Sequence, residues 1–333
     1  MIPAVLLSLL DRKIKEVSPE STIADHFDLF AGTSTGAILI SGLVIPATSK
    51  HQRWRYAPEE LIKIYKDWGP IIFNNPLAYR LKSGLGLRSA KYPSDGIDQC
   101  LNAYFGNKSL SQLGKPVLIP SFDVENKKSV FFTQHKAVRD FNSDFYLWDV
   151  IRATTAAPAF FEPPTIYSLG DFKSRKRYTM IDGGIYAQNP ALCAYAEAIA
   201  DPHFQSITSK VKASNMCICS LGTGDTQKSY SPEKIRKWGI LQWARPLVSI
   251  MMGAAAQTID YQLRQVFSAV NSENQYTRIN PELPDNVSNY MDDSSPENLD
   301  NLIEFAYRFA ESEEVNHKLN HVIDNIFPED KTS

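Results

Sequence analysis

A short glycine-bracketed turn between two apolar segments constrains the fold of this chain more than any other feature. Residues 32–36 read G-T-S-T-G, after the apolar run 26–32 and before the apolar run 37–45. The first run has the length of a buried strand, and the second is long enough for a helix. A strand, a sharp turn and a helix are the context of a nucleophile elbow, which exposes a serine hydroxyl. A purely structural turn explains the same letters, so the motif alone leaves both interpretations open.

The rest of the chain alternates between apolar strands and amphipathic helices. We expect a strand hairpin from segments 115–124 and 128–134, and further strands within 173–184 and 215–225. Helices are expected at 1–15, 58–73, 147–164, 189–200, 231–270 and 299–319, with a long surface loop at 74–88. This alternation is typical of an α/β protein with a mostly parallel sheet and helices on both faces.

Composition excludes several classes of protein. The 333 residues are 43% hydrophobic and carry a formal net charge of −2, which favours a globular core and gives no general attraction to nucleic acid. No apolar run reaches the roughly 18 residues of a membrane-spanning helix. The cysteines have no C-x-x-C spacing, which favours reduced thiols in the cytoplasm: Cys100, Cys193, Cys217 and Cys219.

Ser34, at the centre of the turn, and Asp182, at the end of a predicted strand, are candidates for one site. A serine hydroxyl becomes a useful nucleophile only when a base takes its proton. Asp182 is followed by Gly183 and Gly184, so its carboxylate is little hindered and could accept that proton. An aspartate that caps an ordinary turn is the alternative interpretation. The two motifs together favour an acyl-transfer site.

The residues around Ser34 have expected supporting roles. Gly32 and Gly36 are expected to provide room where the strand crosses the helix. The backbone N–H of Thr35, at the helix N-terminus, is expected to help hold an oxyanion, with Thr33 completing the turn.

Several segments resemble the patatin-like phospholipase family over nearly the whole chain. They are the turn at 32–36, the alanine- and proline-rich segment 152–163, the Asp-Gly-Gly motif at 182–184, and similar stretches at 220–224, 276–284 and 291–302. The resemblance implies a single domain over 1–333 with a three-layer α/β/α fold and a mostly parallel central sheet. It also implies hydrolysis of lipid esters through an acyl-enzyme, with Ser34 as nucleophile and Asp182 as base, and without histidine, metal or cofactor.

One departure from the family pattern concerns the start of the sequence. Family members carry a glycine-rich loop before their first helix, and its backbone N–H groups form the oxyanion hole. The sequence here opens on what resembles that helix. We therefore expect residues 1–333 to lack the first strand and this loop, and to be weakly active or inactive as they stand, because loss of one oxyanion donor costs about 100- to 1000-fold in rate.

Two alternative functions remain open at this point. A histidine-dependent serine esterase would need a histidine after Asp182, which His203, His317 or His321 could supply. A truncated pseudo-hydrolase would bind lipid or a partner protein without hydrolysis. His317 and His321 also have the i, i+4 spacing of a metal clamp, but a solvated helix face is the better interpretation, and we expect no metal site.

Two segments are candidates for contact with lipid. A basic tip at 173–177 precedes the Asp182 strand, and an apolar segment at 237–256 carries two tryptophans and flanking bases. A solvated hairpin and ordinary core packing are the respective alternatives. The expected substrate is a membrane phospholipid or other lipid ester, the expected location is cytoplasmic with peripheral contact at membranes, and the sequence leaves the head group, acyl position and oligomeric state open.

Overall fold

The computed structural model describes the chain except residues 50–51, 85–87, 206–210, 227–230, 289 and 329–333. Its main sheet has five strands, and two smaller pairs of parallel strands, β6–β8 and β7–β9, form separate hydrogen-bonded sheets. The strands are β1 (Phe30–Ala31), β2 (Val117–Asp123), β3 (Lys128–Thr133), β4 (Thr165–Tyr167), β5 (Arg177–Asp182), β6 (Ile218–Leu221), β7 (Asp225–Thr226), β8 (Tyr276–Ile279) and β9 (Glu282–Leu283).

The strand β2 is the organising element of the main sheet. The whole of β3 pairs with β2 in antiparallel register, opposite Leu118 to Asp123. A strand has only two edges, so β1 and β5 must share the other edge. There β1 runs parallel to the start of β2, and β5 runs antiparallel to its end. The C-terminal ends of β1 and β5 therefore approach each other along one edge of β2.

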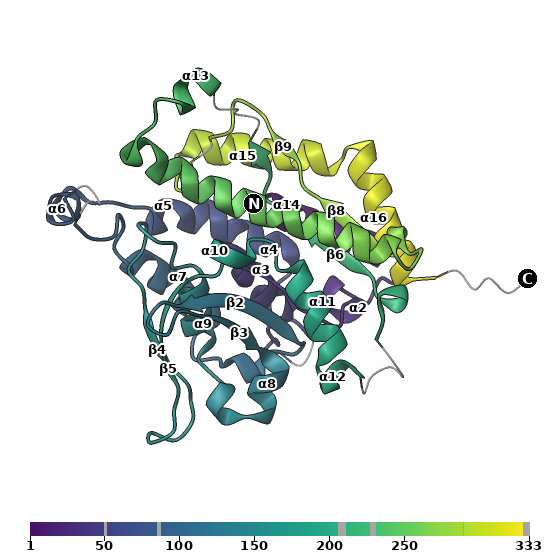
Figure 1. Cartoon of the computed structure of the whole chain (residues 1–333). Helices are drawn as coiled ribbons and strands as arrows, with labels where there is room; N and C mark the ends of the chain where they lie inside the picture. Colours follow the sequence, from purple (N-terminus) through teal and green to yellow (C-terminus); the bar gives the residue numbers. More distant parts are fainter. Residues whose placement is uncertain (50–51, 85–87, 206–210, 227–230, 289, 329–333) are drawn as a thin grey trace, which may run out of the picture.

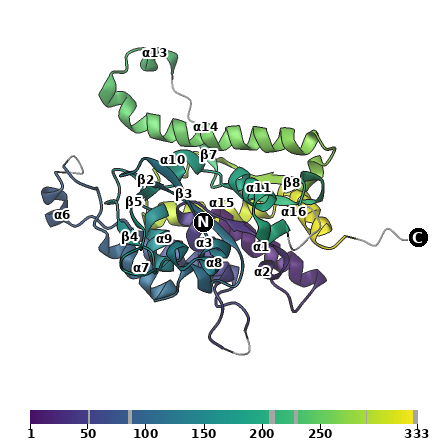
Figure 2. The same cartoon turned by 60° about the horizontal axis from the view of Figure 1, so that its bottom comes forward.

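Helices cover both faces of this sheet (Figures 1 and 2). In Figure 2, α14 lies above the strands with α10 just beneath it, and α3 and α7 lie below the strands. The helices are α1 (Ile2–Val17), α2 (Ile23–His26), α3 (Thr35–Val44), α4 (Pro58–Lys63), α5 (Gly69–Ile72), α6 (Leu77–Lys82), α7 (Asp95–Phe105), α8 (Gln134–Arg139), α9 (Leu147–Thr154), α10 (Gly184–Ala187), α11 (Ala191–Ala200), α12 (Pro202–Gln205), α13 (Pro232–Ile235), α14 (Ile240–Ser268), α15 (Pro296–Ala310) and α16 (Glu313–Ile326).

The expected α/β class with layered helices is confirmed, and the sheet is more mixed than expected. The pairs β1–β2, β6–β8 and β7–β9 are parallel. The hairpin partner β3 and the strands β4 and β5 run antiparallel to their neighbours. The antiparallel strands arise because short turns, rather than crossover helices, connect β2 to β3 and β4 to β5.

Two clusters of buried side chains hold the fold together. The larger draws on both ends of the chain, from Ile2 in α1 to Val322 in α16, and packs under the main sheet. The smaller joins α11 to β8 and to the second half of α14. Its members are Ala191, Ala213, Leu263, Phe267 and Tyr276. The second half of α14 is thus anchored by its own buried contacts.

Some expected boundaries were wrong for local reasons. The strand expected at 26–32 is only Phe30–Ala31, because Asp25 accepts from the Thr22 N–H and caps the short helix α2 in front of it. The expected loop at 74–88 contains α6, which begins directly after Pro76. The helix expected at 147–164 ends at Thr154, ten residues before Pro164.

The C-terminal region also differs from expectation. The single helix expected at 299–319 is two helices, because α15 ends at Ala310 and Ser312 caps α16 by accepting from the Val315 N–H. Between α4 and α5 the chain makes a π-helical turn at Ile64–Trp68. Short 3₁₀ turns occur at Leu110–Gln112, Phe141–Ser143, Ala213–Asn215 and Glu273–Gln275.

In the described part of the chain, no helix has both the length and the apolar character needed to cross a membrane.

Candidate active site

The candidate site lies where β1 and β5 meet along the edge of β2. Ala31 of β1 is opposite Leu118, and Asp182 of β5 is opposite Ser121. The chain leaving β1 turns into α3, and the chain leaving β5 turns into α10. Both turns therefore lie beside Pro120, one of the two residues between Leu118 and Ser121, and this brings together two segments about 150 residues apart.

Ser34 and Asp182 are in hydrogen-bond contact at this point. The Ser34 hydroxyl donates to Oδ2 of Asp182 at 2.6 Å. Ser34 has φ 54° and ψ −128°, an unusual backbone conformation for a residue other than glycine. Such a conformation costs about 1–3 kcal/mol and persists only where the surroundings enforce it. Here it directs the side chain out of the strand-to-helix turn, toward the carboxylate.

Burial and two hydrogen bonds set the properties of Asp182. Its residue is 3% exposed, and its second oxygen, Oδ1, accepts from the Gly184 N–H at 2.7 Å. Burial raises the pKa of Asp182 to about 6, and the hydrogen bonds from Ser34 and Gly184 partly oppose that rise. A carboxylate with a raised pKa holds a proton more readily than an exposed one, so Asp182 is a better proton acceptor than an ordinary aspartate.

Two threonines fix the turn around Ser34. The Ser34 N–H donates to the hydroxyl of Thr154 at 3.0 Å, and that hydroxyl donates to the Pro120 carbonyl at 2.6 Å. Thr33 donates its hydroxyl to the Ala187 carbonyl of α10 at 2.6 Å. Thr154 was not among the sequence-predicted site residues. Its presence in the alanine- and proline-rich segment was visible, but only the fold shows that α9 ends beside the turn.

The glycines of the two motifs have unequal roles. A Cβ on Gly32 would lie 2.5 Å from the Gly36 carbonyl oxygen, and one on Gly183 would lie 2.2 Å from the Pro120 carbonyl oxygen, so neither position has space for a side chain. The expected need for space at Gly36 was wrong, because a Cβ there would meet nothing within 4 Å. A Cβ on Gly184 would lie 2.9 Å from Cε of Met252 in α14, which places this helix directly beside the Asp182 turn.

Thr35 opens the site to solvent. It is the first residue of α3 and is exposed, while Ser34 is half-buried between it and Asp182. The N–H groups in the first turn of a helix have no intrahelical acceptor, so the Thr35 N–H is available beside the Ser34 hydroxyl. The carbonyl of Thr35 accepts from the Tyr65 hydroxyl at 3.2 Å, which ties the start of α3 to the π-helical turn.

The histidines considered as catalytic bases lie elsewhere. His203 stacks against His135, with 5.5 Å between the ring centroids. His317 and His321 contact each other through their Nε2 atoms at 3.2 Å on the exposed side of α16. Among the described residues, no hydrogen bond of Ser34 or Asp182 involves a histidine. Asp182 is thus the base that touches the nucleophile candidate.

A second cluster of titratable side chains joins α8 to α11. The Nε2 atom of His135 lies 2.8 Å from Glu197 and 3.6 Å from Asp201, and the three groups have the spacing of a metal-ligand set. Lys136 and Arg139 already form ion pairs with Glu197 and Asp201, respectively, at 2.5 and 2.8 Å. A metal ion would have to compete with both cations, so the cluster is better described as a link between two helices.

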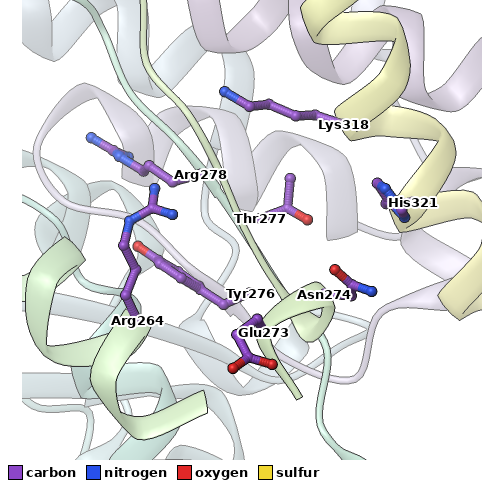
Figure 3. Close-up of a pocket in the computed structure, with 8 residues that line it drawn as sticks. All are labelled: Arg264, Glu273, Asn274, Tyr276, Thr277, Arg278, Lys318 and His321. Carbon is purple, nitrogen blue, oxygen red and sulfur yellow. The ribbon is translucent and has the colours of Figure 1, made fainter. Parts of the chain in front are cut away.

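Two cavities lie away from the Ser34–Asp182 contact. Figure 3 shows one of about 130 Å³, with Arg264 and Arg278 on one side and Lys318 and His321 of α16 on the other. Arg264 pairs with Asp260 and Lys318 pairs with Glu314, so much of this positive charge is neutralised. The other, about 540 Å³, lies between α1, α2 and the segment before α4. Neither is lined by the candidate catalytic residues.

Comparisons with known proteins agree with the site's motifs. Residues 7–195 match the family described as "Patatin-like phospholipase". The chain is 31% identical over 313 residues to "Probable inactive patatin-3-Kuras 1" of Solanum tuberosum, covering 91% of this chain and 81% of that protein. It is 30% identical to "Patatin-04/09" of the same species, covering 91% and 78%. It is 29% identical to "Patatin-like protein 2" of Oryza sativa subsp. indica, covering 92% and 79%.

Proposed function

The chain belongs to the patatin-like phospholipase family, and from that premise we propose that it is a lipid acyl hydrolase whose nucleophile is Ser34 and whose base is Asp182. The observation that carries this proposal is the 2.6 Å hydrogen bond between the Ser34 hydroxyl and the Asp182 carboxylate. A family match alone would leave the two motifs as sequence similarity. Their contact supplies the nucleophile and base that the reaction requires.

The first half of the reaction forms an acyl-enzyme. Oγ of Ser34 attacks the ester carbonyl carbon while its proton moves to Oδ2 of Asp182. The tetrahedral intermediate carries a negative oxygen, which the N–H of Thr35 and the positive end of α3 stabilise. Collapse of the intermediate breaks the bond to the alcohol oxygen, which takes the proton from Asp182 and leaves.

The second half releases the acid. Asp182, ionised again, takes a proton from a water molecule as that water attacks the acyl carbon. Breakdown of the second intermediate returns the proton to Oγ of Ser34 and frees the carboxylic acid. The Gly184 N–H on Oδ1 keeps Oδ2 directed at Ser34 through both halves. One carboxylate thus performs the proton transfers of both steps.

The experiment that tests this proposal uses two substitutions and a matched control. Ser34→Ala and Asp182→Asn should each abolish hydrolysis of a soluble p-nitrophenyl ester, and Ser34→Ala should abolish labelling by a fluorophosphonate probe. Ser41→Ala is the control. Ser41 lies in α3, the helix that begins directly after Ser34, and its buried hydroxyl has no hydrogen-bond partner among the described residues. Undiminished hydrolysis or labelling in Ser34→Ala would overturn the proposal.

A lipid-binding protein without hydrolysis is the second candidate. The first of the three relatives above carries the name "Probable inactive patatin-3-Kuras 1", although the chain is similarly close to patatins without that designation. The fluorophosphonate probe separates the two functions, because it labels an activated serine only. A histidine-dependent esterase is separated by the triple change of His203, His317 and His321 to Gln, which should leave turnover unchanged.

We further propose the setting in which this activity operates. The substrate is a membrane phospholipid or another lipid ester, and the protein acts in the cytoplasm with peripheral contact at membranes. Residues 1–333 act as a single domain. The larger buried cluster supports that last point, because it includes side chains from Ile2 to Val322.

A further inference from the structure

The helix α14 carries apolar side chains on two opposite faces. One face is buried, where Ile259, Leu263 and Phe267 pack into the smaller core cluster. A helix turns about 100° per residue, which places Leu247 and Leu263 on roughly opposite sides. A helix that is apolar on one face needs one partner, and a helix that is apolar on two faces needs a second.

The second face is exposed in the first half of α14. Four of its large apolar residues are between 40% and 89% exposed and lie opposite the buried face: Ile240, Leu247, Ile250 and Met251. We call these four residues the outward stripe. From Pro246 to Ile259 the helix has no charged residue. Large apolar side chains gathered on one exposed face of a helix are typical of a surface that binds a partner.

Basic side chains border the outward stripe at one end. Lys234, Arg236 and Lys237 are exposed on and after α13, against one acidic residue, Glu233, whose carboxylate accepts from the Ser231 hydroxyl. This end therefore presents a net positive charge beside an apolar surface. The combination complements the anionic head groups and acyl chains of a lipid bilayer.

The basic tip considered from the sequence lacks this combination. Arg177 forms an ion pair with Glu125 at 2.7 Å, and Lys176 lies 3.8 Å from Asp140. Arg175 stacks over the rings of Tyr167 and Phe172. Of the four basic residues at 173–177, two are thus paired with carboxylates and a third is engaged with aromatic rings.

The position of α14 connects this surface to the candidate active site. Figure 2 shows α14 lying across one side of the molecule, with α13 beyond its first turn. Met252, one residue after the end of the outward stripe, faces Gly184 beside Asp182. Met252 and the outward stripe lie on opposite sides of α14, so a lipid surface bound to the stripe would be about one helix diameter, ~10 Å, from the turn that carries Asp182.

We propose that the outward stripe of α14, with Lys234, Arg236 and Lys237, docks on the surface of an anionic phospholipid bilayer. This proposal rests on the proposed function, because a lipid hydrolase must reach its substrate in a membrane. Vesicle binding is nevertheless measured separately from ester hydrolysis. The apolar residues enter the boundary between head groups and acyl chains, and the basic residues contact the anionic head groups.

The experiment measures binding to sedimented vesicles of phosphatidylcholine, with and without phosphatidylglycerol. The parent chain should bind the mixed vesicles more tightly, and less so as salt is raised. The double substitution Leu247→Ser with Met251→Ser should weaken binding to both vesicle types by about tenfold or more, because it removes two of the exposed apolar side chains that would enter the bilayer. Arg236→Gln with Lys237→Gln should weaken binding to mixed vesicles by roughly tenfold and leave the neutral vesicles unaffected.

Matched controls separate adsorption from folding and from chemistry. Val138→Ser with Phe141→Ser removes two apolar residues in and after α8 that are even more exposed, and should leave vesicle binding unchanged. Ser34→Ala should bind vesicles like the parent, whereas Leu247→Ser with Met251→Ser should still hydrolyse the soluble ester.

If the parent hydrolyses no ester but binds vesicles through α14, the proposed function fails and the docking surface stands. If the α14 variants bind vesicles like the parent, or only lose self-association in sedimentation, the docking proposal is overturned.

Discussion

At the scale of single residues, the site contains two energetically unfavourable features that neighbouring residues stabilise: the backbone conformation of Ser34 and the burial of the Asp182 carboxylate. Ser34 has a positive φ, and Asp182 is a carboxylate buried without a cation beside it in the described structure. The hydroxyl of Thr154 satisfies the Ser34 N–H, and the Gly184 N–H satisfies one oxygen of Asp182. Each unusual state is therefore paired with a specific polar partner, which is typical of residues positioned for chemistry.

The raised pKa of Asp182 predicts how activity depends on pH. The base must be ionised to accept the Ser34 proton, and burial raises its pKa to about 6. Turnover of a soluble ester should therefore be high above that value and should fall as pH drops through it, by roughly tenfold for each further pH unit. Steady-state kinetics across this range test the prediction, with thermal stability measured in parallel as the control for unfolding. Constant turnover down to about pH 4, where an ordinary aspartate titrates, would contradict it.

Thr154 is predicted to position Ser34. Thr154→Val removes the acceptor of the Ser34 N–H and the donor to the Pro120 carbonyl, and should lower the free energy of unfolding by about 1–3 kcal/mol. It should also reduce turnover while leaving the pH midpoint of turnover unchanged.

Thr155→Val is the matched control for this change. Its hydroxyl donates to the Ile151 carbonyl, which also accepts from a backbone N–H, so its loss should cost less than about 1 kcal/mol. Chemical denaturation and ester kinetics compare the two variants. Equal effects from both would show that Thr154 has no special role.

At the scale of elements, the strand-to-helix turn is held by close backbone approach. Gly32 faces the carbonyl of Gly36 across the turn, and Gly183 faces the carbonyl of Pro120. The hydroxyl of Thr33 then bonds to α10, so the turn after β1 and the turn after β5 are joined through more than the Ser34–Asp182 pair. The two turns form one rigid unit around the candidate site.

The two glycines of the first turn are predicted to respond in opposite ways. Gly32→Ala places a methyl group against backbone and should lower the free energy of unfolding by about 1–3 kcal/mol or more, with loss of turnover. Gly36→Ala meets open space within α3 and should be neutral or stabilising by up to about 1 kcal/mol, because alanine favours helix. Thermal denaturation of both variants tests the difference, and a similar loss for both would contradict it.

Much of the local structure could be predicted from the sequence, and the failures have physical causes. The hairpin of β2 and β3 and the strand that ends at Asp182 follow from apolar patterning around clear turns. The break between α15 and α16 was missed, because the cap at Ser312 interrupts an apolar pattern that continues across it. The roles of Thr154 and Gly36 depend on which elements approach the turn, and no local pattern encodes that approach.

At the scale of the whole molecule, the fold joins the two ends of the chain around one large cluster. Helices α1, α15 and α16 contribute to it together with the strands that carry the site. Lys13 of α1 also donates to Asn320 of α16 at 3.0 Å. The C-terminal helices are therefore part of the scaffold beneath the candidate active site, although the family match ends at residue 195.

This arrangement predicts a single cooperative unfolding transition. Leu319→Ala removes a fully buried side chain of α16 and should lower the free energy of unfolding by about 2–5 kcal/mol. Helical circular dichroism and fluorophosphonate labelling of Ser34 should be lost together, at the same lowered temperature. His317→Ala, on the exposed side of the same helix, is the control and should change stability by less than about 0.5 kcal/mol. Labelling that survives after α16 has unfolded would show that the ends are separate domains.

Because β1 and β5 both pair with β2, the spacing of their pairing positions along β2 determines how far apart the two halves of the site lie. Ala31 and Asp182 pair with Leu118 and Ser121, and a strand advances about 3.3 Å per residue. One residue inserted or removed between Leu118 and Ser121 would shift the two halves by more than the 2.6 Å that separates their reacting atoms. Although β2 contributes no side chain to the reaction, it thus fixes the distance between Ser34 and Asp182. The surrounding loops can vary, and so change which substrate is bound, without changing that distance.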